Sequence, residues 1–182
     1  EQIISALFGY GSFNKDSVIN SSLALFYFAL GLPAFALIKV FSIFFFANHD
    51  TKTPFYISLV SVILNIFISV YYFGKIGFVI IPIATSISSW FNAIVLFLFL
   101  RNRKLFFFTE IFFIKFIKII SSSVLMGLFF NFLLNCFQNQ LSYDQNIKSF
   151  YLILSVVLSL LFYLFICYLI KAFKMSDIQL KY

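Results

Sequence analysis

The stretch that decides the fold runs from Leu32 to Pro54 and reads LPAFALIKVFSIFFFANHDTKTP. Its first part is apolar except for Ser42 and one charged residue, Lys39, and a polar segment follows from Asn48. A long apolar run that ends in a polar turn is typical of a helix that spans a lipid bilayer and then reaches water. The rest of the chain, on both sides of this stretch, repeats the pattern.

Composition places the chain among membrane proteins. Hydrophobic residues make up 63% of the 182 residues and charged residues only 10%, whereas a soluble domain carries about 25% charged residues. The net charge of +7 could indicate a nucleic-acid partner, but the basic residues lie at the ends of the apolar runs. Anionic lipid headgroups and cytoplasmic helix ends favour cations there, so we expect no nucleic-acid partner.

Five apolar segments are long enough to span a bilayer, since a spanning helix needs about 20 residues. They are residues 21–47, 54–73, 77–100, 112–137 and 149–170. Backbone groups in hydrocarbon must be hydrogen-bonded within their own segment, so helices are expected. The sequence therefore predicts an all-α fold, a polytopic transmembrane bundle of five spanning helices. Thr53 is expected to cap the second helix, with Pro54 in its first turn and a tight turn at 74–77 after it.

The distribution of basic residues predicts the orientation of these helices. If the five helices alternate, one side of the membrane carries nine cations: Lys52, Arg101, Arg103, Lys104, Lys115, Lys118, Lys171, Lys174 and Lys181. The other side carries three: Lys15, Lys75 and Lys148. Cytoplasmic loops are enriched in Lys and Arg, so the C-terminus is expected in the cytoplasm. The missing initiator Met leads us to expect the C-terminal part of a longer protein.

Polar residues follow one face of each of two neighbouring helices. The helix at 54–73 carries Ser58, Ser61, Asn65 and Ser69, and the helix at 77–100 carries Thr85, Ser88, Ser89 and Asn92. Spacings of three and four residues place each set on one helical face. Such faces can hold membrane helices together through hydrogen bonds. They can also line a site for a cation or a substrate, and the sequence leaves both interpretations open.

Charged and helix-breaking residues mark further candidates. Lys39 lies about two turns from the polar end of its helix, where it can extend to the interface or face a polar cavity. Pro33, after Gly31, is expected to kink its helix, and Pro82 to do the same near the start of another. His49 and Asp50 are expected to form a solvated turn.

Enzyme chemistry is not expected. The acidic residues Glu1, Asp16, Asp50, Glu110, Asp144 and Asp177 all lie outside the spanning segments or at their ends. The sequence has no His/Cys cluster of metal-ligand spacing, no glycine-rich phosphate loop and no nucleophile–His–acid set. We therefore predict no catalytic residues and no metal site of clustered side chains.

Several motifs, taken in order, resemble the MurJ (MviN) family of lipid II flippases. They are FGYGSF at 8–13, ALGLPAFALIKV at 29–40, FANHDTKTP at 46–54, LN at 64–65, WFNA at 90–93 and RNR at 101–103. The family has fourteen helices in the multidrug/oligosaccharidyl-lipid/polysaccharide exporter fold. The resemblance implies that residues 1–104 end the C-terminal lobe with its last three helices. Residues 105–182 would then supply two further helices, which form a groove for the polyprenyl tail, and a short cytoplasmic tail.

The resemblance also implies site residues. Some family members have a sodium site, whose pattern falls on Asn65, Ser69, Ile81 and Thr85 of this chain. Ser69 stands where the pattern has a carboxylate, which removes the charged ligand. Lys39, Asn65 and Asn92 are expected to line the substrate cavity or its gate.

The implied function is transport. Lipid II, the undecaprenyl-pyrophosphate-linked cell-wall precursor, would move from the inner to the outer leaflet of the bacterial inner membrane by alternating access. No cofactor is expected other than a coupling ion, Na⁺ or H⁺, and the full-length chain would work as a monomer among membrane lipids. Two alternatives stay open: an exporter of polysaccharide lipids or drugs, and a membrane scaffold subunit that transports nothing.

Overall fold

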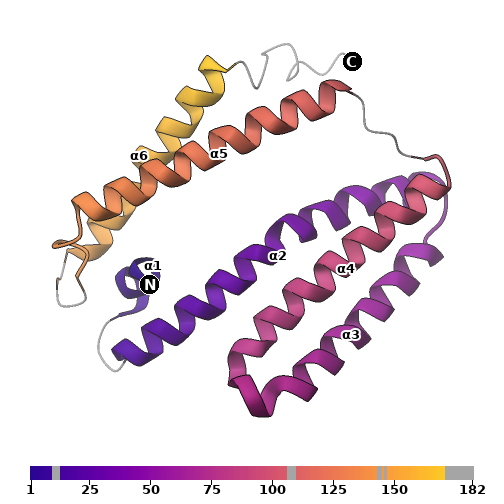
Figure 1. The fold of residues 1–182 in the computed structure, drawn as a ribbon, viewed down its shortest axis with the longest axis horizontal. Helices are drawn as coiled ribbons and strands as arrows, with labels where there is room; N and C mark the ends of the chain where they lie inside the picture. Colours follow the sequence, from indigo (N-terminus) through magenta and orange to yellow (C-terminus); the bar gives the residue numbers. More distant parts are fainter. Residues whose placement is uncertain (10–12, 106–109, 143–144, 146, 171–182) are drawn as a thin grey trace. The chain divides into compact units, whose positions relative to one another are not determined.

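The computed structural model describes residues 1–9, 13–105, 110–142, 145 and 147–170. Its helices are α1 (Gln2–Phe8), α2 (Lys15–Ala47), α3 (Lys52–Ile76), the short 3₁₀ helix η1 (Gly77–Val79), α4 (Ile80–Asn102), α5 (Glu110–Cys136) and α6 (Lys148–Leu169) (Figure 1). The described part of the chain contains no strand, which confirms the all-α prediction.

The five long helices, α2 to α6, match the five expected spans. Four continuous helical stretches of the described residues are long and apolar enough to cross a membrane, and one of them, Lys52–Asn102, contains both α3 and α4. The chain forms two compact units. The first unit consists of α2, α3, η1 and α4, and the second of α1, α5 and α6.

Helices α3 and α4 form a hairpin (Figure 1). The expected turn at 74–77 begins later than predicted, because α3 continues through Gly74 and Lys75 to Ile76. The chain reverses at Gly77, whose φ of 75° and ψ of −155° lie in a region that only glycine adopts readily. Gly77 therefore sets the position of the reversal.

Helix α2 packs against α4 through a glycine. A Cβ atom on Gly31 would lie 2.8 Å from the Ser86 hydroxyl oxygen and 3.2 Å from the Ser86 Cα. The hydroxyl of Ser86 donates to the carbonyl of Tyr27 at 2.5 Å, and Trp90 Nε1 donates to the carbonyl of Leu30 at 2.9 Å. Small residues allow membrane helices to approach this closely, and side-chain donors then reach the neighbouring backbone.

Pro33 lies inside α2, within the span that the sequence predicts, and the kink expected there stays a prediction. The helix is continuous from Lys15 to Ala47 with Pro33 inside it. Proline lacks an N–H group and so leaves the carbonyl four residues earlier, that of Ala29, without its usual donor. Ser86 and Trp90 of α4 donate to two carbonyls near Ala29, those of Tyr27 and Leu30. These contacts support the helix where proline weakens it.

The second unit joins α1 to the start of α6. Lys148 Nζ donates to the carbonyl of Gly9 at 2.7 Å, and the hydroxyl of Ser149 donates to the carbonyl of Ala6 at 2.5 Å. These carbonyls end α1, where backbone acceptors lack helical partners and a cation is favoured. Lys148 begins α6 and is only 1% exposed. The docking of α1 explains this burial.

A candidate polar groove and an ion-paired turn

The two polar helix faces predicted from the sequence meet in the first unit. They line an open groove of about 430 Å³. Its lining consists of Phe35 and Ile38 from α2, Ser58, Ser61, Val62 and Asn65 from α3, and Thr85, Ser88, Ser89 and Asn92 from α4. The spacing of three and four residues predicted both faces, and the α3–α4 hairpin turns them toward each other.

Asn65 is the centre of the hydrogen bonds between α3 and α4. Its Nδ2 donates to the hydroxyl oxygens of Thr85 at 3.1 Å and Ser88 at 3.3 Å, and its Oδ1 accepts from Ser69 at 3.5 Å. The hydroxyl of Thr85 donates in turn to the carbonyl of Ile81 at 2.8 Å. The structure thus links all four residues of the implied sodium pattern.

In this arrangement, the four residues satisfy one another. No carboxylate is among them, and both polar atoms of the Asn65 amide have partners. A cation at this position would share Asn65 Oδ1 with the Ser69 hydroxyl, because the amide oxygen has two acceptor positions. The geometry is that of hydrogen-bonded helix packing, and a cation site at Asn65, Ser69, Ile81 and Thr85 stays a prediction.

Asn92 lies further along the same groove and is not fully paired. Its Nδ2 donates to the Ser58 hydroxyl oxygen at 3.3 Å, but its Oδ1 has no hydrogen-bond partner among the described residues. The residue is 7% exposed. An unpaired amide oxygen this deeply buried is uncommon in proteins, since leaving it unsatisfied has a free-energy cost.

Lys39 does not belong to this groove. Helix α2 contributes Phe35 and Ile38 to the lining, while Lys39 is exposed on another part of the helix. Within the described part of the chain, no residue forms an ion pair or hydrogen bond with it. The structure therefore brings Asn65 and Asn92 together without Lys39, whose place in a cavity or gate stays a prediction.

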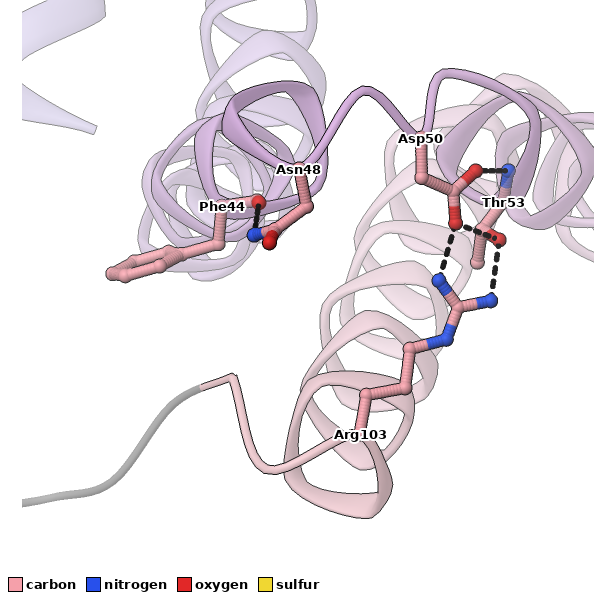
Figure 2. Close-up of polar contacts among 5 residues, drawn as sticks. All are labelled: Phe44, Asn48, Asp50, Thr53 and Arg103. Carbon is pink, nitrogen blue, oxygen red and sulfur yellow. Dashed lines mark hydrogen bonds and ion pairs between the residues drawn. The ribbon is translucent and has the colours of Figure 1, made fainter.

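An ion pair that the sequence did not reveal joins the α2–α3 turn to the end of α4 (Figure 2). Arg103 Nη1 pairs with Asp50 Oδ2, and Arg103 Nη2 donates to the Thr53 hydroxyl oxygen at 3.2 Å. The same carboxylate accepts the Thr53 backbone N–H at 3.0 Å and the Thr53 hydroxyl at 2.7 Å. Figure 2 shows the contacts of Thr53 and Arg103 with the Asp50 carboxylate, and the further contact that joins Arg103 to the Thr53 hydroxyl.

Thr51 occupies the N-cap position of α3 without a side-chain cap, and the carboxylate of Asp50, one residue earlier, caps the first turn instead. The prediction of Thr53 as the cap is wrong, because Thr53 lies inside the first turn and returns a hydrogen bond to the capping carboxylate. Asp50 lies three residues before Thr53, and Asp is a favoured residue for capping a helix N-terminus, which could have indicated this. Hydrogen bonds from the hydroxyl and N–H of Thr53, and from Arg103, hold the pKa of Asp50 well below its usual range.

Similar backbone turns position both partners of the ion pair. At the end of α2, His49 has a φ of 57° and the Asp50 N–H donates to the Phe45 carbonyl at 3.0 Å. At the end of α4, Lys104 has a φ of 56° and the Leu105 N–H donates to the Leu100 carbonyl at 3.1 Å. This is the Schellman pattern, in which a left-handed residue ends the helix and redirects the chain.

The turn at the end of α2 is also stabilised by side chains. Asn48 Nδ2 donates to the Phe44 carbonyl at 2.8 Å (Figure 2). The ring of the fully buried Phe45 lies 5.7 Å from the guanidinium carbon of Arg103. The guanidinium is thus held by the carboxylate, the threonine hydroxyl and an aromatic face.

The ion pair confirms that the α2–α3 turn and the end of α4 lie at the same end of the first unit. The cations at this end are Lys52, Arg101, Arg103 and Lys104, whereas Lys15 and Lys75 lie at the opposite ends of α2 and α3. Lys171, Lys174 and Lys181, which also entered the charge count, lie outside the described residues.

Comparison with known proteins agrees with the family resemblance of the sequence motifs. A family model described as "Lipid II flippase MurJ" matches residues 1–152. A protein of Rickettsia prowazekii named "Probable lipid II flippase MurJ" is 38% identical over 90 residues, which are 50% of this chain and 18% of that protein. Proteins with the same name from Thermotoga maritima and Borreliella burgdorferi are 39% identical over 88 residues and 31% identical over 159 residues.

The coverage of these relatives is partial. The Thermotoga match covers 48% of this chain and 19% of the relative, and the Borreliella match covers 87% and 31%. The chain therefore spans less than a third of the length of each of these three proteins.

Proposed function

The chain belongs to the lipid II flippase MurJ family, and from this premise we propose that the full-length protein translocates lipid II across a bacterial inner membrane. The observation that carries the proposal is the family match, which extends over α1 to α5 and into α6. The relatives are named for lipid II flipping, and the long apolar helices provide the membrane-spanning structure that this activity needs.

The proposed direction is from the inner to the outer leaflet by alternating access. Two features support this mechanism. The helices form two compact units, each with its own packing, and alternating access in transporters moves one packed helical unit against another. One of these units also contains a polar groove. Two membrane helices that only pack against each other would need fewer polar residues than line this groove, which favours a role in transport.

The cation-rich end of the first unit is proposed to face the cytoplasm. Lys52, Arg101, Arg103 and Lys104 gather there, and the positive-inside rule favours this orientation. The C-terminus would then also lie in the cytoplasm. The proposed partners are lipid II and the surrounding lipids, the full-length chain would act as a monomer, and Na⁺ or H⁺ would be the coupling ion.

Complementation in cells tests this proposal. The full-length gene is expressed in bacteria whose own lipid II flippase can be depleted, with membrane insertion checked by an epitope tag. The proposal predicts that the protein restores growth and cell shape. Lysis of the depleted cells despite normal amounts of inserted protein would contradict it.

A membrane scaffold is the second candidate, and the hydrogen bonds of Asn65 favour it. They join α3 to α4 directly, as packing contacts do. A scaffold predicts that Asn65→Leu and Lys39→Leu leave the activity of the full-length protein unchanged. Transport predicts that at least one of these variants, inserted at normal amounts, fails to complement.

A further inference from the structure

Helix α1 belongs to the same compact unit as α5 and α6, although α2 follows it in the chain. We infer that α1 stays bound to the start of α6 while the protein changes conformation. Its contacts form a clasp between Ala6 and Gly9 on one side and Lys148 and Ser149 on the other. The inference rests on the proposed transport only for the occasion of the movement, because the binding of α1 is tested without transport.

The clasp has a polar part, whose donors all come from α6. The side chains of Lys148 and Ser149 donate to the carbonyls of Gly9 and Ala6. These carbonyls belong to the last turn of α1 and the residue after it, where helix carbonyls lack N–H partners within the helix. Separation of α1 from α6 would leave both carbonyls and the ammonium group in need of new partners.

The clasp also has an apolar part, which takes one residue from each of three segments. Ala6 of α1, Leu141 after α5 and Leu152 of α6 form a buried cluster. Phe137 and Tyr151 pack against this cluster, with ring centroids 5.3 Å apart. Departure of α1 would therefore uncover Leu141 and Leu152, in addition to breaking the hydrogen bonds.

The burial of Lys148 is the strongest argument for a permanent contact. Lysines at the ends of membrane helices normally extend into water, yet Lys148 is the first residue of α6 and is almost completely buried. Its ammonium group lies at the end of α1, where the helix dipole favours a positive charge. A clasp that opened in every transport cycle would have to bury this charge anew each time, which costs free energy.

The consequence concerns which helices move together. Residues 2–9 precede α2 directly in the chain, but their described contacts tie them to the two C-terminal helices. A permanent clasp makes α1 a part of the C-terminal unit in every conformation. Any displacement of α6 would then be passed on to the segment that leads into α2.

Disulfide cross-linking of the full-length protein in membrane vesicles tests the inference. Ala6→Cys and Leu152→Cys are introduced together into a variant without other cysteines, because the two side chains belong to one cluster. The expected disulfide forms equally fast at rest and with lipid II and an ion gradient present, and it leaves transport unchanged. Transport that stops on oxidation and returns on reduction would overturn the inference, because α1 would then have to leave α6.

The result also separates the clasp from the proposed function. If the protein without a cross-link moves no lipid II, the proposed function fails, while a constant cross-linking rate still supports the clasp. A cross-linking rate that falls with lipid II and the gradient would overturn the clasp and leave the function intact. Absence of a disulfide both here and in the pair Ala6→Cys with Ser149→Cys would overturn it as well.

Variants of Lys148 test the polar contact separately. Lys148→Met removes the donor to Gly9, so the disulfide between residues 6 and 152 should form about tenfold more slowly, whereas Lys148→Arg should keep the rate. Lys75→Met makes the same exchange at an exposed lysine of α3 and should change nothing. Equal rates in Lys148→Met and Lys75→Met would contradict the role of Lys148. Ser149→Ala removes the other donor and provides the measurement if Lys148→Met does not fold.

Discussion

Arg103 at the end of α4 holds Asp50 in the turn between α2 and α3, across 53 residues of sequence. The contact joins three helix ends, because Asp50 also caps α3 through Thr53. The helices next to Asp50 and Arg103, α2 and α4, each end in a left-handed residue, His49 and Lys104 respectively. The ion pair therefore connects the ends of α2, α3 and α4 at the cation-rich end of the first unit.

Substitution of Asp50 should show its two roles separately. Asp50→Asn keeps an oxygen that can cap α3 but loses the ion pair, whereas Asp50→Ala loses both. We expect both variants to unfold at lower temperature than wild type, with the larger fall, by a few degrees, for Asp50→Ala. Thermal unfolding in detergent measures the order, and equal falls for the two variants would assign no role to the cap.

The stability that Asp50 contributes should depend on pH with a definite sign. Its folded-state pKa is lowered by Thr53 and Arg103, so the contribution is complete above the unfolded pKa of about 4 and declines as pH falls toward the folded value. The difference in unfolding temperature between wild type and Asp50→Asn should therefore be constant from pH 5 to 8. It should shrink below about pH 4. A difference that grows on acidification would contradict the assignment.

Two glycines near the α3–α4 turn should respond in opposite ways to alanine. Gly77 has a positive φ, so Gly77→Ala should destabilise the protein by about 1–2 kcal/mol. Gly74 lies within α3 with no atom within 4 Å of an added Cβ, so Gly74→Ala should stabilise it by about 0.5–1 kcal/mol. Denaturant unfolding of the two variants measures the signs, and stabilisation by Gly77→Ala would rule out the turn described above.

The close approach of α2 and α4 predicts the effect of enlarging Gly31. Its added Cβ would meet both the hydroxyl and the Cα of Ser86, and the Cα belongs to the backbone and cannot rotate away. Gly31→Ala should therefore cost about 1–3 kcal/mol through strain. Gly127→Ala in α5, where an added Cβ meets nothing within 4 Å, is the matched control and should not destabilise. A neutral Gly31→Ala would show that the two helices are further apart.

Removal of the Asn65 amide should weaken the hairpin modestly. Asn65→Leu loses the donors to Thr85 and Ser88, and hydrogen bonds between membrane helices contribute about 0.6 kcal/mol each on average. We expect a loss of about 1 kcal/mol in unfolding free energy. The double variant with Thr85→Val should lose less than the sum of the single losses, because the two residues share a contact.

The sequence predicted the features that depend on spacing along one helix. Ser58 and Asn65 lie on the same face of α3 as their spacing of seven residues requires, and this face meets the polar face of α4. Features that depend on distant residues were not predictable. Arg103 could not be assigned to Asp50, and the burial of Lys148 depends on α1, which begins near the other end of the chain.

Pro33 illustrates the same limit, and the kink expected there stays a prediction, since the structure shows only that α2 continues through it. A proline removes a local hydrogen bond, which the sequence shows, but α4 supplies Ser86 and Trp90 as donors to the adjacent carbonyls, which it does not. Lys39 shows the same limit. Its position in an apolar run placed it in a membrane helix, but the sequence did not indicate which face of α2 would contact α4.

The most direct measurement is translocation of lipid II by the purified full-length protein in sealed proteoliposomes. Fluorescent lipid II is incorporated into both leaflets, and its accessibility to an external quencher is followed after an ion gradient and membrane potential are applied. We predict that the protein moves the labelled lipid II from one leaflet to the other, faster than protein-free liposomes do. Rates equal to those of protein-free liposomes, with folded and correctly inserted protein, would contradict the account.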